Sequence, residues 1–201
     1  MKILAKIILF FFLLTSQVHA TSNATKWLKL EIDNILLAYQ NDNISTVKRF
    51  EYIENTIDQN FAGAGIAKFV AGKAWSLADK ETKKTYIKLF KRHLALNIAA
   101  MMQGYSKQTY AFIDTKVDKA NNVYMIDMEV QDKVNKLLIT WRVKESKERF
   151  YVIDMLVSDI SLVRTKRSEF NSVLKKIDYD LKDFNAKLYK QNESSYNKLT
   201  Q

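Results

Sequence analysis

Apolar positions recur at helical spacing through the first half of the chain. Between residues 27 and 57 they lie three or four apart, which predicts two amphipathic helices, the second opened by Ser45 or Thr46. Residues 61–75 are small and apolar and hold three of the four glycines, so we expect a short packed helix that enters a turn. Asp79 is a favourable N-cap for a long helix that ends near Gln103.

The period changes to two in the second half. Four β-branched and aromatic segments with short polar breaks between them predict an antiparallel meander, at residues 109–117, 123–130, 137–143 and 150–157. Alternation predicts one apolar face on strands two to four, made of Tyr124, Ile126, Met128 and Val130, of Leu137, Ile139, Trp141 and Val143, and of Tyr151, Ile153, Met155 and Val157. Two amphipathic stripes over 163–177 and 177–188 predict closing helices. The expected architecture is α+β, with helices and a twisted four-stranded antiparallel sheet.

The first twenty residues are typical of a secretory signal peptide. Lys2 and Lys6 precede a short apolar core, and Ala20 ends a stretch of small to medium residues of the kind that a signal peptidase cleaves. An uncleaved N-terminal anchor is the alternative. Because the chain has no proline and few glycines, nothing marks a linker, and we expect a single domain over 21–190. Residues 191–201 are predicted to be a polar, frayed C-terminal tail.

The net charge and the cysteine content limit the kinds of ligand and partner that we expect for this chain. Removal of Lys2 and Lys6 with the signal lowers the net charge from +10 to +8. An exported basic protein suits an anionic partner such as lipid headgroups, although solubility alone explains the charge equally well. Nucleic acid is not expected in that compartment. The absence of cysteine excludes disulfides and thiolate metal sites.

The sequence has few features of an enzyme. His93 is the one histidine left after signal removal, and no metal-ligand spacing, glycine-rich phosphate loop or nucleophile motif is present. Asp127 and Glu129 fall on the polar face of one predicted strand. Asp154 lies in an apolar strand, and we expect it to play a structural role, hydrogen-bonded to a nearby loop or to an arginine. The sequence therefore predicts neither an enzyme nor a cofactor.

Several segments, taken in order, resemble one family. They are Gly72-Lys73-Ala74-Trp75 before the long helix, Thr140-Trp141-Arg142 on strand three, the run YVIDMLVSDISLVRTKRSEFNSVL over residues 151–174, and the closing pattern from Asp180-Leu181 to Lys187-Leu188. Together they resemble the MlaC family, the periplasmic phospholipid-binding component of Mla-type lipid transport systems, also called toluene-tolerance auxiliary proteins. The resemblance covers about residues 25–190.

The resemblance implies a periplasmic phospholipid carrier with an apolar pocket between sheet and helices, in a fold that is NTF2-like in part. Acyl tails would enter the pocket and the headgroup would stay outside. The implied partners are an outer-membrane lipoprotein–porin complex and an inner-membrane ABC transporter complex, served by a monomeric carrier. An exported α+β scaffold or interaction domain without a lipid ligand is the main alternative, and an NTF2-like enzyme is a weaker one.

Site residues follow from this interpretation. Aromatic and methionine stripes are more often core than pocket, so the residues are candidates only through the resemblance. The pocket candidates are Phe90, Leu94, Ile98, Tyr105, Tyr110, Phe112, Ile139, Trp141, Tyr151, Ile153 and Met155. The candidates for contact with a headgroup or an acidic partner are Arg142, Arg164, Lys166 and Arg167, which as isolated charges are more often merely solvated.

Overall fold

The structure is a computed structural model that describes residues 22–104, 108–131 and 135–201. The predicted signal peptide and the pocket candidate Tyr105 lie outside the described residues. The helices before the sheet are α1 (Asn23–Gln40), α2 (Thr46–Asn60), α3 (Gly63–Ala71), α4 (Lys73–Leu77) and α5 (Lys80–Met102). None of the described helices has both the length and the apolar run needed to cross a membrane.

Polar side chains open the three longer helices of this half. Ser22, Ser45 and Asp79 each accept a hydrogen bond from the backbone N–H three residues later. Such caps satisfy N–H groups that have no partner within the first turn. The predicted caps Ser45 and Asp79 are therefore confirmed. The short helix expected within 61–75 is α3, and it enters a turn at Gly72, which adopts a positive φ of 53° that side chains rarely tolerate. The brief helix α4 that follows this turn was not expected.

The sheet is a fully antiparallel meander in the order β1-β2-β3-β4-β5. Its strands are β1 (Thr109–Asp118), β2 (Val123–Gln131), β3 (Lys136–Ser146), β4 (Arg149–Val157) and β5 (Ile160–Ser161). The four predicted strands are confirmed, and the short β5 was not expected. The chain then forms α6 (Leu162–Lys175) and α7 (Leu181–Thr200). The predicted α+β class is correct.

The prediction of a frayed tail is wrong. Helix α7 continues through residues 191–201 to Thr200, and Asn192 and Leu199 are buried. The side chain of Asn192 donates to the carbonyl of Leu89 and accepts from the ring of His93, both on α5. These long-range contacts hold a polar segment in helical form.

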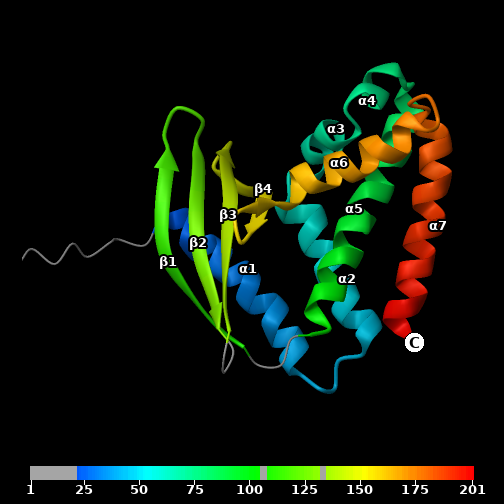
Figure 1. The fold of residues 1–201 in the computed structure, drawn as a ribbon. Helices are drawn as coiled ribbons and strands as arrows, with labels where there is room; N and C mark the ends of the chain where they lie inside the picture. The colour runs from blue at the N-terminus through cyan, green and yellow to red at the C-terminus, as the bar shows by residue number, and fades with distance from the viewer. Residues whose placement is uncertain (1–21, 105–107, 132–134) are drawn as a thin grey trace, which may run out of the picture.

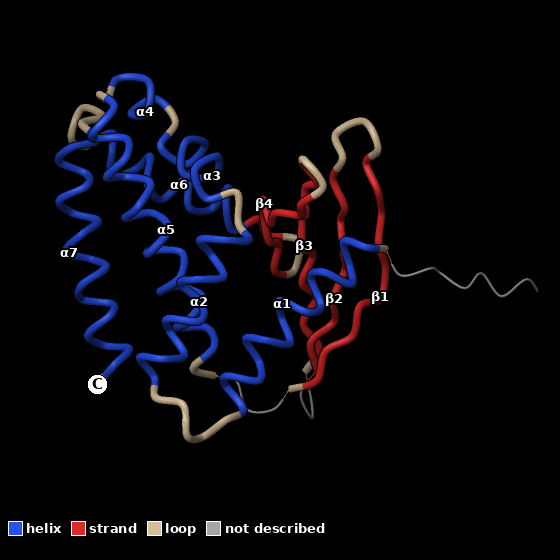
Figure 2. Tube along the Cα trace, turned by 180° about the vertical axis from the view of Figure 1, so that it is seen from behind, coloured by secondary structure: helices blue, strands red, loops and turns tan. Residues whose placement is uncertain are grey.

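The elements form two regions. Helices α2 to α7 make a bundle beside β4, with α5 running through it between α2 and α7 (Figure 1). Helix α1 leaves the bundle and crosses one face of the sheet, as the view from behind also shows (Figure 2). The sheet is thus covered by a single helix on that face.

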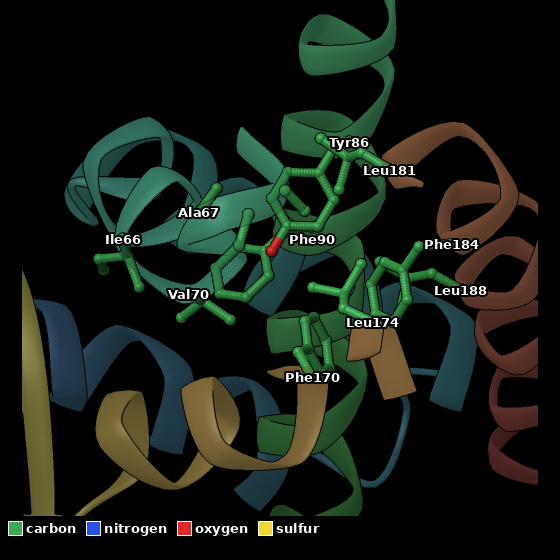
Figure 3. Close-up of a cluster of buried hydrophobic side chains, with 12 residues drawn as sticks. Ile66, Ala67, Val70, Tyr86, Phe90, Phe170, Leu174, Leu181, Phe184 and Leu188 are labelled. Carbon is green, nitrogen blue, oxygen red and sulfur yellow. The ribbon is translucent and has the colours of Figure 1, made fainter. Parts of the chain in front are cut away.

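The bundle has a dense aromatic core. Tyr86 and Phe90 of α5 meet Phe170 of α6 and Phe184 of α7, and the rings of Phe170 and Phe184 lie 4.8 Å apart (Figure 3). Full burial of such a side chain stabilises the fold by roughly 1.5–3 kcal/mol. A second cluster joins α2 to the C-terminal half of α5, and a third joins α1 to the sheet. Phe61, at the end of α2, packs against all three clusters.

Candidate functional site

One face of the sheet is apolar and turned toward α1; we call it the inner face. The side chain of Thr25 on α1 hydrogen-bonds to Thr115 on β1 at 3.1 Å, and the hydroxyl of Tyr110 donates to Asp33. The Trp27 ring of α1 lies 5.7 Å from the Phe150 ring of β4. These contacts lie between Thr25 and Asp33 on α1, so they fix which face of the sheet this part of the helix covers.

Strand register brings several pocket candidates together on this face. Directly paired residues of antiparallel strands share a face, so each row across the sheet forms one apolar stripe. The rows are Phe112–Met128–Ile139–Val157 and Thr115–Ile126–Trp141–Met155. Phe112, Ile139, Trp141 and Met155 are partly buried, whereas Ile126 and Met128 are buried between them. The predicted faces of strands two and three are thereby confirmed.

The predicted face of strand four is wrong over its first half. A β-bulge between Arg142 and Val143 shifts the register, so that Val143 pairs with Val152 and Lys144 pairs with Tyr151. Tyr151 therefore lies on the opposite face from Trp141 and Met155, and Ile153 is the extra residue of the bulge. Val152 and Phe150 take their places on the inner face and pack in the cluster with α1.

The pocket candidates on α5 belong to the bundle. Phe90 is fully buried in the aromatic core. Leu94 packs against both bundle clusters, and Ile98 packs against the cluster shared with α2. Among the described residues, Phe61 packs against both bundle clusters and against the cluster of the inner face, so it links these three residues to that face. Sequence reasoning missed Phe61, although its position between a helix end and the glycine-rich segment was a usable signal.

Two surface grooves occur elsewhere on the molecule. One lies between α1 and α2 with a volume of about 540 Å³, and the other lies between α5 and α7 with a volume of about 640 Å³. Neither is lined by any of the pocket candidates. The predicted hollow between sheet and helices thus stays a prediction.

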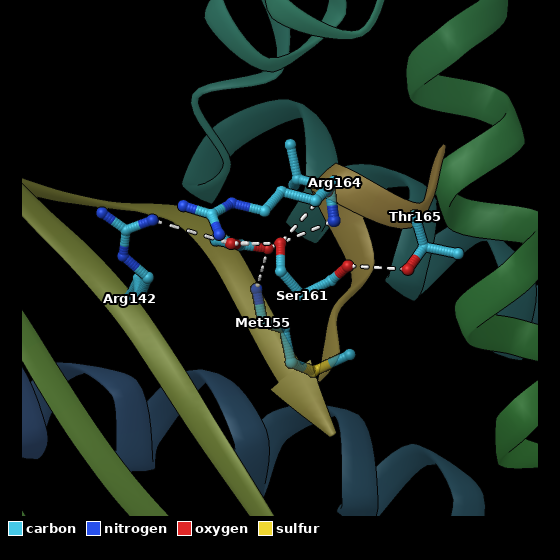
Figure 4. Close-up of polar contacts among 7 residues, drawn as sticks. Arg142, Met155, Ser161, Arg164 and Thr165 are labelled. Atoms are coloured by element: carbon cyan, nitrogen blue, oxygen red, sulfur yellow. Dashed lines mark hydrogen bonds and ion pairs between the residues drawn. The ribbon is translucent and has the colours of Figure 1, made fainter. Parts of the chain in front are cut away.

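A buried carboxylate joins the sheet to the bundle. Asp154 of β4 is 5% exposed and accepts hydrogen bonds from the hydroxyl of Ser161 and from the backbone N–H groups of Met155 and Val163 (Figure 4). The guanidinium of Arg142 lies 3.7 Å away. Ser161 also caps α6 by accepting from the N–H of Arg164. A negative charge at a helix N-terminus is favourable, so the predicted structural role of Asp154 is confirmed.

The four cationic side chains that are candidates for headgroup contact differ in the partners that they already bind. Arg142 faces Asp154, and Lys166 pairs with Glu169 at 2.7 Å. Arg167 donates to the carbonyl of Phe69 and stacks over its ring at 4.4 Å. The exposed side chain of Arg164 has no ion-pair partner among the described residues. Arg164 is therefore the most available of the four for an anionic group.

Buried polar atoms without partners are few. Within the described residues they include Nε1 of Trp141, the hydroxyl of Tyr86 and Nε2 of His93. Burial, reinforced by the nearby charge of Lys166, lowers the pKa of His93 to about 4, so the ring is neutral at pH 7. The described residues contain no group of three His, Cys, Asp or Glu side chains able to hold a metal.

Comparisons with known proteins bear on this geometry. The model of the MlaC protein family matches residues 31–189. A solved structure with a similar fold is a phospholipid-binding protein from Ralstonia solanacearum in complex with a phospholipid. The two superpose with a TM-score of 0.74 at 18% identity, covering 87% of this chain and 99% of the other. The search among curated proteins finds no match.

Proposed function

Because the chain belongs to the MlaC family, we propose that it carries a phospholipid and shields the acyl tails against the inner face of the sheet. The observation that carries this proposal is the gathering of Phe112, Ile139, Trp141 and Met155 on one face, where they are only partly buried. Partly exposed aromatic and thioether side chains have apolar area left to bury against a hydrocarbon chain. The phospholipid bound to the Ralstonia protein supports the same ligand class here.

The energetics explain why a carrier is needed. Two acyl chains expose on the order of 30 methylenes, and each costs about 0.8 kcal/mol in water, so free transfer costs roughly 20 kcal/mol or more. A carrier must offset most of this cost and still release the lipid. Met128 and Met155 on the inner face suit such a lining, because methionine adapts its shape at little cost. The chain then acts without catalysis and without a cofactor.

The wider setting forms part of the proposal. The signal peptide over residues 1–20 directs the chain to the periplasm, where it works as a monomer. It takes lipid from one membrane complex and delivers it to another, the two being an outer-membrane lipoprotein–porin complex and an inner-membrane ABC transporter complex. Arg164 and its neighbours on α6 contact the headgroup or an acidic partner surface.

Lipid extraction and native mass spectrometry of the protein purified from the periplasm test the proposal. We expect copurified phospholipid, and uptake of phospholipid from vesicles after delipidation. Ile139→Asp should reduce bound lipid about tenfold or more, because a charge on the inner face meets the tails. Met125→Asp is the matched control, since Met125 pairs with Arg142 on the opposite face.

Circular dichroism of both variants separates lost binding from lost folding. If Ile139→Asp unfolds the chain, Ile139→Asn provides a milder replacement. A lipid-free protein that takes up no phospholipid would contradict the proposal and favour the scaffold alternative. Equal lipid content in the folded Ile139→Asp and Met125→Asp variants would move the tails away from the inner face.

A further inference from the structure

The indole of Trp141 holds a buried hydrogen-bond donor. Its Nε1 atom is enclosed, and no described residue accepts a hydrogen bond from it. An indole N–H can only donate, and a buried one ordinarily finds a partner, because an unpaired buried donor costs free energy. The fold therefore carries a cost that a ligand with a suitable acceptor would remove.

The position of Trp141 places this donor on the inner face of the sheet. Trp141 pairs with Ile126 and Met155, and it packs against the cluster that joins α1 to the sheet. Thr115 is the polar member of the same row, but Ile126 separates it from Trp141, and its hydroxyl is hydrogen-bonded to Thr25. An acceptor for the indole would therefore be supplied from outside the chain.

The inner face around Trp141 is uncharged. The row of Trp141 and the rows on either side of it contain no Lys, Arg, Asp or Glu, the neighbouring rows being Phe112–Met128–Ile139–Val157 and Val117–Tyr124–Val143–Val152. Two rows away on one side, Lys29 and Asp33 of α1 pair with each other at 2.5 Å, beside Tyr110. Two rows away on the other side, Glu145 accepts from the hydroxyl of a tyrosine of β2.

These surroundings favour an uncharged acceptor. Arg142 follows Trp141 in the chain but lies on the opposite face, where it approaches Asp154. A phosphate beside Trp141 would therefore lack a cation, and an unpaired buried charge is unfavourable. The ester carbonyls that join acyl tails to glycerol are acceptors without a charge. We propose that Nε1 of Trp141 donates a hydrogen bond to an ester carbonyl of the bound phospholipid, an inference that rests on the proposed function.

The burial of the neighbouring rows indicates how the tail extends from this ester. On one side of Trp141, Val143 and Val152 are buried in the cluster with α1. On the other side, Phe112 and Ile139 are only partly buried. A tail that begins beside Trp141 therefore runs along Phe112 and Ile139, where apolar area remains to be covered. The hydrogen bond sets how deeply the lipid enters.

The test compares a diacyl phospholipid with its diether analogue, which has the same headgroup and chain length but no ester carbonyl. The probes are dipalmitoyl phosphatidylglycerol and dihexadecyl phosphatidylglycerol, which compete for the delipidated protein in native mass spectrometry. We expect the parent protein to bind the diacyl lipid about fivefold more tightly, as one neutral hydrogen bond would give.

Variants show whether Trp141 is the donor. Trp141→Phe keeps an aromatic ring and removes the N–H, so it should lose most of the preference and still bind both lipids. Trp75→Phe on α4 is the matched control, because Trp75 packs against the bundle core, and it should keep the preference. Since all three proteins meet the same two lipids, differences between the lipids themselves cancel. In the parent protein, the indole ¹H–¹⁵N NMR signal of Trp141 should shift more with the diacyl lipid than with the diether.

Three results would overturn the proposal. They are equal binding of the two lipids by the parent protein, an unchanged preference in Trp141→Phe, and an equal shift of the Trp141 indole signal with both lipids. Each of them leaves phospholipid binding intact, so the proposed function would survive. Failure of the parent protein to bind either lipid would overturn both the proposed function and this inference.

Discussion

The helical bundle and the sheet bury their apolar side chains to different extents. In the bundle, Tyr86, Phe90 and Leu174 have no exposed surface. On the inner face of the sheet, Ile139, Trp141 and Met155 keep part of theirs. The bundle has several helices packed around α5, whereas the inner face is covered by α1 alone (Figures 1 and 2).

This difference separates two tasks. A close-packed interior has no room for a ligand without repacking, so the bundle core is suited to stabilising the fold. An apolar face under a single helix can gain contacts if a hydrocarbon chain enters. The fold is thereby held by one region, while the other retains apolar area for a ligand. Substitutions matched between the two regions test this contrast.

The largest expected effect is in the bundle core. Phe90→Ala removes a buried ring that packs against Tyr86 and Phe170. We expect the free energy of unfolding to fall by about 3–5 kcal/mol, because the cavity cannot collapse fully. Met155→Ala on the inner face should cost less than half as much, since Met155 is partly exposed. Urea denaturation of both variants measures the difference, and equal losses would remove the contrast.

Acid should weaken the bundle through His93. Its pKa is about 4 in the folded protein, against 6.5 for an ordinary histidine. Between these values the unfolded chain binds a proton that the folded chain does not, so stability falls as the pH drops from about 6.5 to 4. The loss from this residue should approach about 3 kcal/mol, at 1.4 kcal/mol per pH unit.

The variant His93→Gln isolates this contribution, because glutamine does not titrate and the carboxylates are unchanged. Urea denaturation at pH 7 and pH 4.5 should show a smaller acid loss for the variant than for the parent protein. The same acid loss in both proteins would mean that His93 is not the titrating group.

The sequence predicted the fold well wherever local chemistry decides it. Asp79 and the apolar stripe were sufficient to predict a long helix ending near Gln103, and α5 ends at Met102. Alternation in β2 and β3 was sufficient to predict the inner face, since their opposite faces carry polar residues such as Asp127 and Thr140. In both cases one face is clearly apolar and the other is not.

The predictions that failed did so because they depend on packing between distant elements and not on local chemistry. In β4 both faces are apolar, so alternation cannot show the bulge that moves Tyr151 to the other face. The burial of Asn192 and Leu199 depends on packing across the bundle. The polar sequence of this segment gives no sign of that packing. For the candidate site, Phe90 in the apolar stripe of α5 was a pocket candidate but belongs to the bundle core. No local feature of the sequence distinguishes a core residue from a pocket residue.

The junction between the two regions should respond to loss of its carboxylate. Asp154→Ala leaves the hydroxyl of Ser161 and the N–H of Val163 without their acceptor. We expect the free energy of unfolding to fall by about 2 kcal/mol, the cost of unpaired buried groups. Asp127→Ala is the control, because Asp127 accepts from Thr140 on the polar face and caps no helix. Equal losses would show that Asp154 contributes no more than an ordinary strand hydrogen bond.

The smallest effect concerns the attachment of α1 to the sheet. Tyr110→Phe removes the hydroxyl that donates to Asp33, while the ring stays beside Phe112 at 5.6 Å. Although burial acts to raise it, hydrogen bonds from Lys29 and Tyr110 lower the pKa of Asp33, so the acceptor is charged at pH 7. The variant should lose about 1 kcal/mol of stability. Tyr52→Phe is the matched control, because the Tyr52 hydroxyl has no hydrogen-bond partner among the described residues.

Hydrogen exchange gives a second measurement: amides of α1 should exchange faster in Tyr110→Phe, and those of α5 should not. Faster exchange throughout α5 would mean that the inner face and the bundle unfold as one unit.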